Sequence, residues 1–429
     1  MMATRLSKLG ILLVAMMLVA ASCGAADEEE GEPSATGGDV SFELRLGTLL
    51  PFTGDLSPFG APADEAARLA IEEIQAAIEE VDLDVTAEIV ANEDTQTDSK
   101  AAVEAANKLA SANDVQAIDG AMASSSTIPV AESVTIPNEI LQVSPASTSP
   151  AISELDDNGF VWRTAPSDAL QGQVLAQAVA DAFGTDVTIN TGTRNDAYGV
   201  ALIDEFVDSW ESEGGEIGEQ IRWNPNAPTF ESEAQQLVQG DPDGWVIIDF
   251  PETWAKFAPA LVRTGDWDPA RTFTADGLKS ETLPEDVGME GTVGMRGTAP
   301  TAKDSPAAEA FDDLWQEKAD IDRETFDAHS FDAVILPFLA AIAAGSGDPA
   351  DMAEEMQGIS GPPGTEYTFE ELPQAIESLI AGEDIDYQGA AGPIDFDDQG
   401  DPSAANYEVW EFDGDGKIAT LEVVPFEAD

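Results

Sequence analysis

Segments with strand-like patterns alternate along this chain with segments of helical period, and this order limits the possible folds more than any other feature. The first three segments are FELRLGTLL at 42–50, a helical segment at 61–78 and VTAEIVANED at 85–94. In the helical segment, apolar residues recur every three or four positions and so lie on one face. Such alternation predicts an α/β fold, in which helices cover parallel sheets.

The alternation continues well into the second half of the chain. A chain of 429 residues is long enough for two domains or lobes, and the two halves of the series look like copies of one architecture. Ligands of such sheets bind beyond the carboxyl ends of the strands, so we expect a site in the loops that follow them. The further segments are helices at 98–111 and 199–213 and strands at 115–120, 139–147, 187–192, 244–250 and 271–277.

The N-terminus has a different character from the rest of the chain. Residues 1–22 carry two basic side chains, Arg5 and Lys8, followed by an apolar stretch at 9–19. This pattern is typical of a secretory signal peptide, and the apolar stretch is too short for a stable membrane span. We therefore expect the protein to be exported.

The only cysteine of the chain, Cys23, stands directly after the small residues Ala20, Ala21 and Ser22. This position is similar to that of the lipidated cysteine in a bacterial lipobox, although a chance cysteine in an ordinary signal peptide is the alternative. Residues 23–41 are small, acidic and rich in glycine, without apolar periodicity, and we predict a flexible acidic tether. A tethered protein of this kind would contact the membrane through its lipid anchor only.

The charge of the chain is extreme, with 84 acidic residues against 18 basic ones and a formal net charge of −66. Nucleic-acid backbones are also negatively charged, so a nucleic-acid partner is not expected. Repulsion among so many acids destabilises a compact state, and salt screens it, with a Debye length of about 3 Å at about 1 M. The composition favours an acidic, halophilic protein, while an acidic surface that serves solubility alone is the alternative.

Motifs for catalysis, metals and cofactors are missing from the sequence. A Ser/His/Asp triad would need the only histidine, His329, and no GxSxG motif accompanies it. One histidine and one cysteine do not suit a zinc site, and neither a P-loop nor a dinucleotide fingerprint is present. We therefore expect no catalytic residue, no metal and no cofactor, and a binding protein rather than an enzyme.

The loops after the predicted strands read, in order, PFTGDLSPFG, NEDTQTD, GAMASSST, SPASTSP, a Tyr-Gly pair and ADG. In this order the chain resembles the type I periplasmic solute-binding proteins of ABC importers, and within them the branched-chain amino-acid-binding (leucine/isoleucine/valine-binding-like) branch in lipoprotein form. The resemblance implies two Rossmann-like lobes with parallel sheets, joined by a three-strand hinge. It assigns lobe 1 to 42–165 plus 298–403 and lobe 2 to 166–297 plus 404–429.

The resemblance also implies ligand-binding residues in the first lobe. Ser124 takes the place of a serine that helps hold the ligand carboxylate, and Ser125 lies beside it. Ala146 would offer its carbonyl to the ligand ammonium, and Thr148 its hydroxyl and N–H, with Ser147 between them. Hydroxyl and amide donors suit a carboxylate. Without the resemblance, a serine-rich loop is more often a solvated turn.

Three further residues are implied in the second lobe, and Phe59 is implied in the first loop of the first lobe. Tyr198 would close over the ligand, and Asp276 would pair with its ammonium group. Phe59 and Phe250 stand where the family commonly has tyrosine, which makes the expected pocket more apolar and suits an aliphatic ligand side chain. Each aromatic residue also has an ordinary alternative as a packing residue.

The function implied by the resemblance is capture of an amino acid, branched-chain or otherwise apolar, in the cleft between the lobes. The lobes would close on the ligand, and the protein would deliver it to an ABC permease and ATPase complex. Such a protein works at the outer face of the cell membrane or in the periplasm. Two alternatives stay open, namely a different small ligand, such as an amide, urea or an aromatic acid, and a sensory receptor ectodomain.

Overall fold

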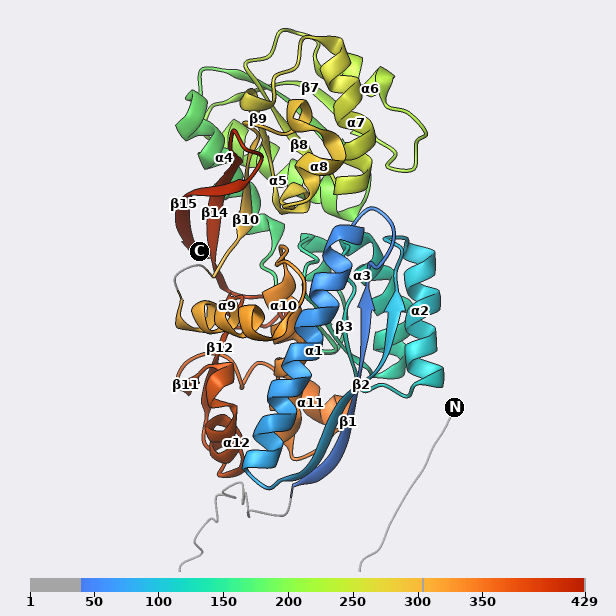
Figure 1. Cartoon of the computed structure of the whole chain (residues 1–429), viewed down its shortest axis with the longest axis vertical. Coiled ribbons are helices and arrows are strands. Elements are labelled where there is room, and N and C mark those ends of the chain that lie inside the picture. Colours follow the sequence, from blue (N-terminus) through green and yellow to red (C-terminus); the bar gives the residue numbers. More distant parts are fainter. Residues whose placement is uncertain (1–39, 303–304, 428–429) are drawn as a thin grey trace, which may run out of the picture. The chain divides into compact units, whose positions relative to one another are not determined.

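The structure is a computed structural model, and it describes residues 40–302 and 305–427 of the chain. The predicted signal peptide, the lipidation site Cys23 and nearly all of the predicted tether lie outside the described residues. The described chain contains two large sheets and one small one, with helices packed on their faces, which confirms the predicted α/β class (Figure 1).

The first sheet has five strands in the order β2-β1-β3-β4-β5, and every neighbouring pair is parallel. Parallel pairing requires a crossover between consecutive strands, and the helical segments of the sequence supply most of these crossovers. The strands are β1 (Ser41–Leu50), β2 (Asp84–Asp94), β3 (Ala117–Gly120), β4 (Leu141–Ser144) and β5 (Val161–Arg163).

Side chains of the first sheet alternate between its two faces. Leu46 of β1 and Ala117 of β3 pack against α1 and α10, whereas Leu49 and Ile118 pack on the opposite face against α2. This is the two-residue period of a strand. The helices around this sheet are α1 (Ser57–Glu80), α2 (Ser99–Ala112), α3 (Ser124–Val130), α9 (Pro306–Lys318), α10 (Asp327–Ala344), α11 (Pro349–Glu355) and α12 (Leu372–Ile380).

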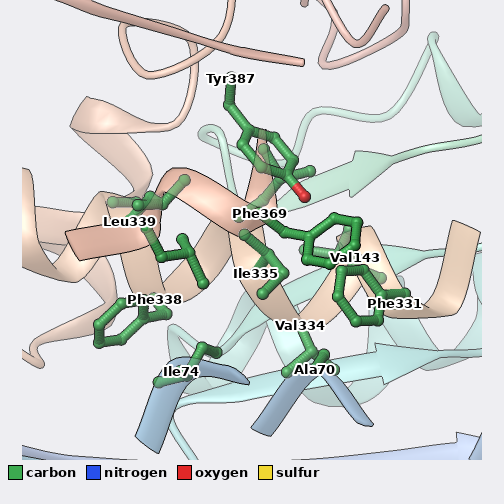
Figure 2. Close-up of a cluster of buried hydrophobic side chains, with 14 of the residues drawn as sticks. Ala70, Ile74, Val143, Phe331, Val334, Ile335, Phe338, Leu339, Phe369 and Tyr387 are labelled. Carbon is green, nitrogen blue, oxygen red and sulfur yellow. The ribbon is translucent and has the colours of Figure 1, made fainter. Parts of the chain in front are cut away.

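Helix α10 is long and apolar enough to cross a membrane, but 89% of its 18-residue window is buried inside the protein. Figure 2 shows why, because Val334 of α10 points toward Ala70 of α1 while Phe331 lies beside Val143 of β4. A helix that is buried on nearly all sides in this way is typical of the centre of a core. α10 is therefore the central core helix of this part of the molecule.

The second sheet has seven strands in the order β15-β14-β10-β9-β8-β6-β7. The strands from β6 to β10 pair in parallel, and β14 and β15 extend one edge as an antiparallel hairpin. The strands are β6 (Thr188–Arg194), β7 (Glu216–Trp223), β8 (Gly244–Ile248), β9 (Thr272–Thr274), β10 (Arg296–Pro300), β14 (Ala404–Phe412) and β15 (Ile418–Glu427).

Helices α4, α5, α6, α7 and α8 pack around the second sheet. The core on one side is rich in tryptophan, with Trp223, Trp245 and Trp254 fully buried among its members. A third, small sheet of three strands lies against α9 and α12. The remaining elements are α4 (Asp168–Phe183), α5 (Ala197–Ser212), α6 (Glu231–Leu237), α7 (Pro251–Thr264), α8 (Leu283–Val287), β11 (Thr365–Tyr367), β12 (Ile385–Gly389) and β13 (Gly392–Pro393).

The chain passes between the two large sheets three times. The first passage follows β5, the second follows β10, and the third precedes β14. The predicted elements are present with bounds shifted by a few residues. The largest shift is at α1, which begins at Ser57 rather than at residue 61, because Pro58 occupies the first turn, where its fixed φ and missing N–H are tolerated.

Candidate functional site

A small cavity lies where loops of both large sheets meet. Nine of its ten lining residues follow β1, β3 and β4 of the first sheet and β6, β8 and β9 of the second, which are the carboxyl ends of parallel strands. The tenth, Phe326, directly precedes α10. The lining residues are Leu56, Phe59, Met122, Ser124, Ala146, Tyr198, Phe250, Asp276, Gly277 and Phe326.

Six of the residues implied by the resemblance line this cavity, and three do not. The backbone carbonyl of Ser125 accepts a hydrogen bond from the Ser99 hydroxyl at 2.7 Å. The Ser147 hydroxyl donates to the carbonyl of Met122 at 3.0 Å, and Thr148 is fully buried behind the wall. The six residues in the wall are Phe59, Ser124, Ala146, Tyr198, Phe250 and Asp276.

Hydrogen bonds join the two serine-containing loops of the first sheet into one unit. The Ser124 hydroxyl accepts from the backbone N–H of Ser149 at 3.2 Å, and the Thr127 and Ser147 hydroxyls lie 2.7 Å apart. The Arg163 guanidinium donates to the carbonyl of Ser149 at 2.9 Å, and Asp401 pairs with the same guanidinium at 2.5 Å. The loops therefore have a fixed geometry, which a binding surface needs.

Asp276 is the charged group of the cavity wall. It begins a short 3-10 turn after β9, and its Oδ1 accepts hydrogen bonds from Gln171 Nε2 at 2.8 Å and from the Tyr198 hydroxyl at 3.1 Å. Burial raises the pKa of Asp276 to about 6, while these hydrogen bonds act in the opposite direction. At neutral pH the cavity thus holds a carboxylate that is mostly ionised.

A second buried carboxylate, Asp168, lies close behind Asp276, and the sequence did not indicate it. Among the residues that the structure describes, neither oxygen of Asp168 has a hydrogen bond of regular distance and angle, and the same is true of Thr148 Oγ1 and Gln171 Oε1, although the Thr148 hydroxyl is close enough to Asp168 to lower its pKa as a donor. Burial and the charge of Asp276 raise the pKa of Asp168 well above its usual range. Since Asp168 is the first residue of α4, its sequence position alone indicates only an ordinary acidic residue in a first helical turn.

Aromatic rings form much of the wall. Tyr198 and Phe250 stack with their ring centroids 5.0 Å apart and an interplanar angle of 14°. The Arg194 guanidinium lies 3.7 Å from the centroid of the Phe250 ring, so Phe250 also has a cation–π contact. Phe250 is therefore held by stacking partners and needs no hydroxyl to keep its position.

Four lining residues were not indicated by the sequence, namely Leu56, Met122, Gly277 and Phe326. Phe326 has a left-handed backbone with φ of 73° just before α10, in a segment with no strand before it. At Gly277, a Cβ atom would lie 2.8 Å from the Tyr198 hydroxyl and 2.8 Å from the Asp249 carbonyl. A glycine is needed there because the turn approaches the tyrosine so closely.

Polar contacts at the rim of the cavity join loops of the two large sheets. Asp55, after β1, accepts from Arg194 Nη2 at 3.1 Å and from the Thr253 hydroxyl at 2.9 Å. Nearby, the Ser57 hydroxyl donates to Glu252 at 3.1 Å. Asp196 and Asp249 also pair with Arg194, and these charges raise the pKa of the guanidinium although burial lowers it. The cavity is thus closed on this side.

Comparison with curated proteins gives relatives that span most of the chain. This chain is 25% identical to the chemotactic signal transduction system substrate-binding protein BasB of Halobacterium salinarum, over 82% of this chain and 83% of that protein. It is 26% identical to Leu/Ile/Val-binding protein homolog 1 of Brucella abortus, over 90% of this chain and 96% of that protein.

Solved structures show the same fold. The substrate-binding protein LivJ of Streptococcus pneumoniae, in complex with isoleucine, has a TM-score of 0.72 at 19% identity and covers 90% of this chain and 100% of its own. A solute-binding protein from R. palustris, in complex with benzoate, has a TM-score of 0.70 at 18% identity, with coverages of 90% and 98%. These likenesses confirm the two-lobed fold of type I periplasmic binding proteins.

A family model described as periplasmic binding protein matches residues 43–383. Members of this family are extracytoplasmic substrate-binding proteins that take small-molecule ligands and work with ABC transporters. All ten residues that line the cavity lie within the matched range. The chain belongs to the periplasmic binding protein family.

Proposed function

We propose that this protein captures an amino acid, branched-chain or otherwise apolar, in the cavity and delivers it to an ABC permease and ATPase complex. The observation that carries the proposal is the position of Asp276, a buried carboxylate in the wall of a mainly apolar cavity. A carboxylate removed from water needs a cationic partner, and the lining residues include no lysine, arginine or histidine. A ligand ammonium group would supply the missing charge.

The acceptors near Asp276 favour an amino group over other ligand ends. Asp168, Thr148 and Gln171 each have a buried side-chain oxygen without a hydrogen bond of regular distance and angle. These residues are linked to Asp276, because Gln171 donates to Asp276 and the Asp168 N–H donates to the Thr148 carbonyl. An ammonium group has three N–H donors and no acceptor, so it matches acceptors that have no donor of their own. An aromatic acid without an amino group would leave Asp276 unpaired.

The other end of an amino acid would meet neutral donors. Ser124 and Ala146 line the cavity on the side of the first sheet. Hydroxyl and backbone N–H groups can hold a carboxylate without a basic residue. In a chain with net charge −66, neutral donors avoid the repulsion that an acidic wall would exert on that carboxylate.

The remaining wall suits an aliphatic side chain. It combines two flexible apolar residues, Leu56 and Met122, with rings of Phe59, Phe250 and Phe326. Apolar walls with a few placed polar groups are the usual composition of small-molecule sites. A polar or charged ligand side chain would lose its hydration here without gaining a partner.

The test is calorimetry of the soluble domain, without the predicted signal peptide, against the common amino acids, benzoate, urea and simple amides in about 1 M KCl, which keeps charge repulsion screened. We expect saturable binding of leucine, isoleucine or valine and none of benzoate. Binding of benzoate or urea without binding of any amino acid would overturn the proposal in favour of the alternative ligands.

Sensing is the second candidate function, and the likeness to a chemotactic substrate-binding protein favours it. Capture of the ligand would be the same, and only the membrane partner would differ. Deletion of the gene separates the two, because loss of uptake of a labelled amino acid supports transport, whereas intact uptake with lost chemotaxis supports sensing.

We propose further that Cys23 carries the lipid that keeps the protein at the membrane. Mass spectrometry of the membrane-bound protein should find a diacylglyceryl modification at the N-terminal cysteine, and Cys23→Ser should release the protein into the medium. Release of the unchanged wild-type protein would contradict the anchor and leave the binding function untouched.

A further inference from the structure

A group of oxygen-bearing side chains interrupts the apolar core between the first sheet and helices α1 and α10. It consists of Thr48 on β1, Asp64 on α1, Asp119 on β3 and Ser330 on α10, and we refer to these four residues as the Asp119 chamber. None of the four lines the ligand cavity. We propose that the Asp119 chamber is a cation site and that its occupant is a calcium ion.

Strand register brings the first two members together. Thr48 of β1 is the Cα partner of Asp119 in β3, so the two side chains stand on the same face of the sheet. Ala117, two residues before Asp119, packs against α1 and α10, and strand alternation points Asp119 toward the same helices. Thr48 and Asp119 are only 0% and 1% exposed.

Asp119 has few donors for its two oxygens. Neither carboxylate oxygen has a hydrogen bond of regular distance and angle in the described ranges, and its one neighbouring donor is the fully buried Ser330 hydroxyl on α10. Burial raises the pKa of Asp119 well above its usual range, the charge of Asp64 adds to the rise, and hydrogen bonding by the Ser330 hydroxyl opposes it. An ionised carboxylate in such a place requires a bound cation, and otherwise it must hold a proton.

Asp64 completes the group and connects it to solvent. Its Oδ1 accepts from the Thr48 hydroxyl at 3.4 Å and also from Asn92 Nδ2. Asp64 is only half-buried, so the group borders solvent at this side chain. Arg68, one turn further along α1, acts on the pKa of Asp64, but its guanidinium already pairs with Glu65 and Glu72.

The chemistry of the chamber selects a hard cation. All its donors are oxygens, with two carboxylates and two hydroxyls, and nitrogen or sulfur ligands for a transition metal are missing from it. Two carboxylates balance one divalent ion. No three His, Cys, Asp or Glu side chains converge in the part of the chain that the structure describes, so hydroxyls and water must fill the remaining positions. Calcium accepts such irregular sets of six to eight oxygens, whereas magnesium needs a regular octahedron.

A cation here would fix two elements beside the ligand cavity. Met122, which lines the cavity, follows Asp119 by three residues, and Phe326 precedes Ser330 by one helical turn. The ion would thus join the end of β3 to the first turn of α10. This inference does not depend on which ligand the cavity binds.

The test compares the wild type with Asp119→Asn, which keeps the shape of the side chain and removes one charge. Both proteins are stripped with a chelator, and their melting temperatures are followed while CaCl₂ is added up to about 10 mM in about 1 M KCl, where surface charges are screened. We expect a saturable rise for the wild type and none for Asp119→Asn. Equilibrium dialysis should find one calcium ion more on the wild type than on the variant.

Two further variants keep the result interpretable. Ser330→Ala removes one oxygen without a change of charge, and we expect it to weaken calcium binding several-fold. Asp332→Asn is the matched control, because its carboxylate already accepts from the Tyr387 hydroxyl at 2.8 Å and from the N–H groups of Ala390 and Ala391 at 3.0 and 2.8 Å. We expect this variant to respond to calcium like the wild type.

Three outcomes would overturn the calcium assignment. If calcium raises the melting temperatures of the wild type and of Asp119→Asn equally, calcium acts on the acidic surface and not at Asp119. A wild type that responds to the exchange of KCl for NaCl but not to calcium would assign the chamber to sodium. No response to any cation would mean that Asp119 holds a proton.

Discussion

Asp55 and Arg194 form an ion pair of 3.1 Å that links the loop after β1 of the first sheet to the end of β6 of the second. The Arg194 side chain is only 3% exposed and also contacts the Phe250 ring of the cavity wall. Closure of the rim and the shape of the ligand wall therefore depend on the same guanidinium.

We expect Asp55→Asn to shorten the lifetime of the ligand complex. Arg194 would still pair with Asp196 and Asp249, which lie in the same sheet layer. The substitution should therefore weaken closure of the cavity rim and leave folding stability nearly unchanged. We predict an affinity about tenfold lower, mainly through faster dissociation, measured by stopped-flow fluorescence.

Asp204→Asn is the matched control for that experiment. It breaks an Arg222–Asp204 pair that lies within the second sheet's layer and is 44% and 52% exposed, and such pairs contribute little. If both variants lose affinity equally, the effect is one of net charge and the closing role of Asp55 is refuted.

If Asp276 pairs with the ligand ammonium as proposed, Asp276→Asn should lower the affinity for a zwitterionic amino acid by about tenfold or more, because it removes that charge. The melting temperature of the ligand-free protein should not fall, since a buried charge is removed and the amide retains hydrogen-bonding capacity. Calorimetry and thermal unfolding provide the two readouts. Unchanged affinity would refute the ammonium assignment.

Asp168→Asn should separate stability from binding in the same manner. The wild-type carboxylate is fully buried and forms no ion pair among the described residues, so we expect its neutralisation to raise the melting temperature of the ligand-free protein. If Asp168 contributes to ammonium binding, affinity falls several-fold in the same variant. A higher melting temperature with unchanged affinity would show that Asp168 acts on the fold alone.

Binding should depend on pH through Asp276. Its folded-state pKa of about 6 exceeds the model-peptide value of 3.8, so affinity for an ammonium ligand should rise as pH increases through about 6. Stability of the ligand-free protein should change in the opposite direction, because the folded state binds this proton more tightly. The stabilising contribution is greatest below pH 3.8 and is lost as pH rises through about 6.

The pH step can be assigned by comparing variants. Asp276→Asn should abolish it, and His329→Gln should retain it, because burial lowers the pKa of His329, the only histidine, to about 3. If His329→Gln abolishes the change in affinity near pH 6, the titrating group is not Asp276.

The sequence predicted the parts of this protein that depend on local periodicity. Strands such as β1 and helices such as α2 have regular apolar spacing, and the loops after parallel strands must gather at one edge of a sheet. The order of these loops also carries the family resemblance, and it was the resemblance that named six of the lining residues in advance. What they bind stays a prediction.

Residues outside such loops could not be found in this manner. Phe326 reaches the cavity from the start of α10, with no strand before it, and its position depends on how that helix packs. Asp168 and Asp119 are two of 84 acidic residues in the chain, and nothing in their local sequence separates a buried acid from a solvated one. Only tertiary packing makes that difference.

The burial of Arg194 also determines how strongly ligand binding should depend on salt concentration. At about 1 M salt the Debye length is about 3 Å, so ions shield exposed charge pairs but do not enter the space between a buried guanidinium and its carboxylates. A zwitterionic ligand has no net charge and is not steered by the acidic surface. We therefore expect the capture of an amino acid to proceed with nearly the same strength in dilute and in concentrated brine, provided that the fold itself persists.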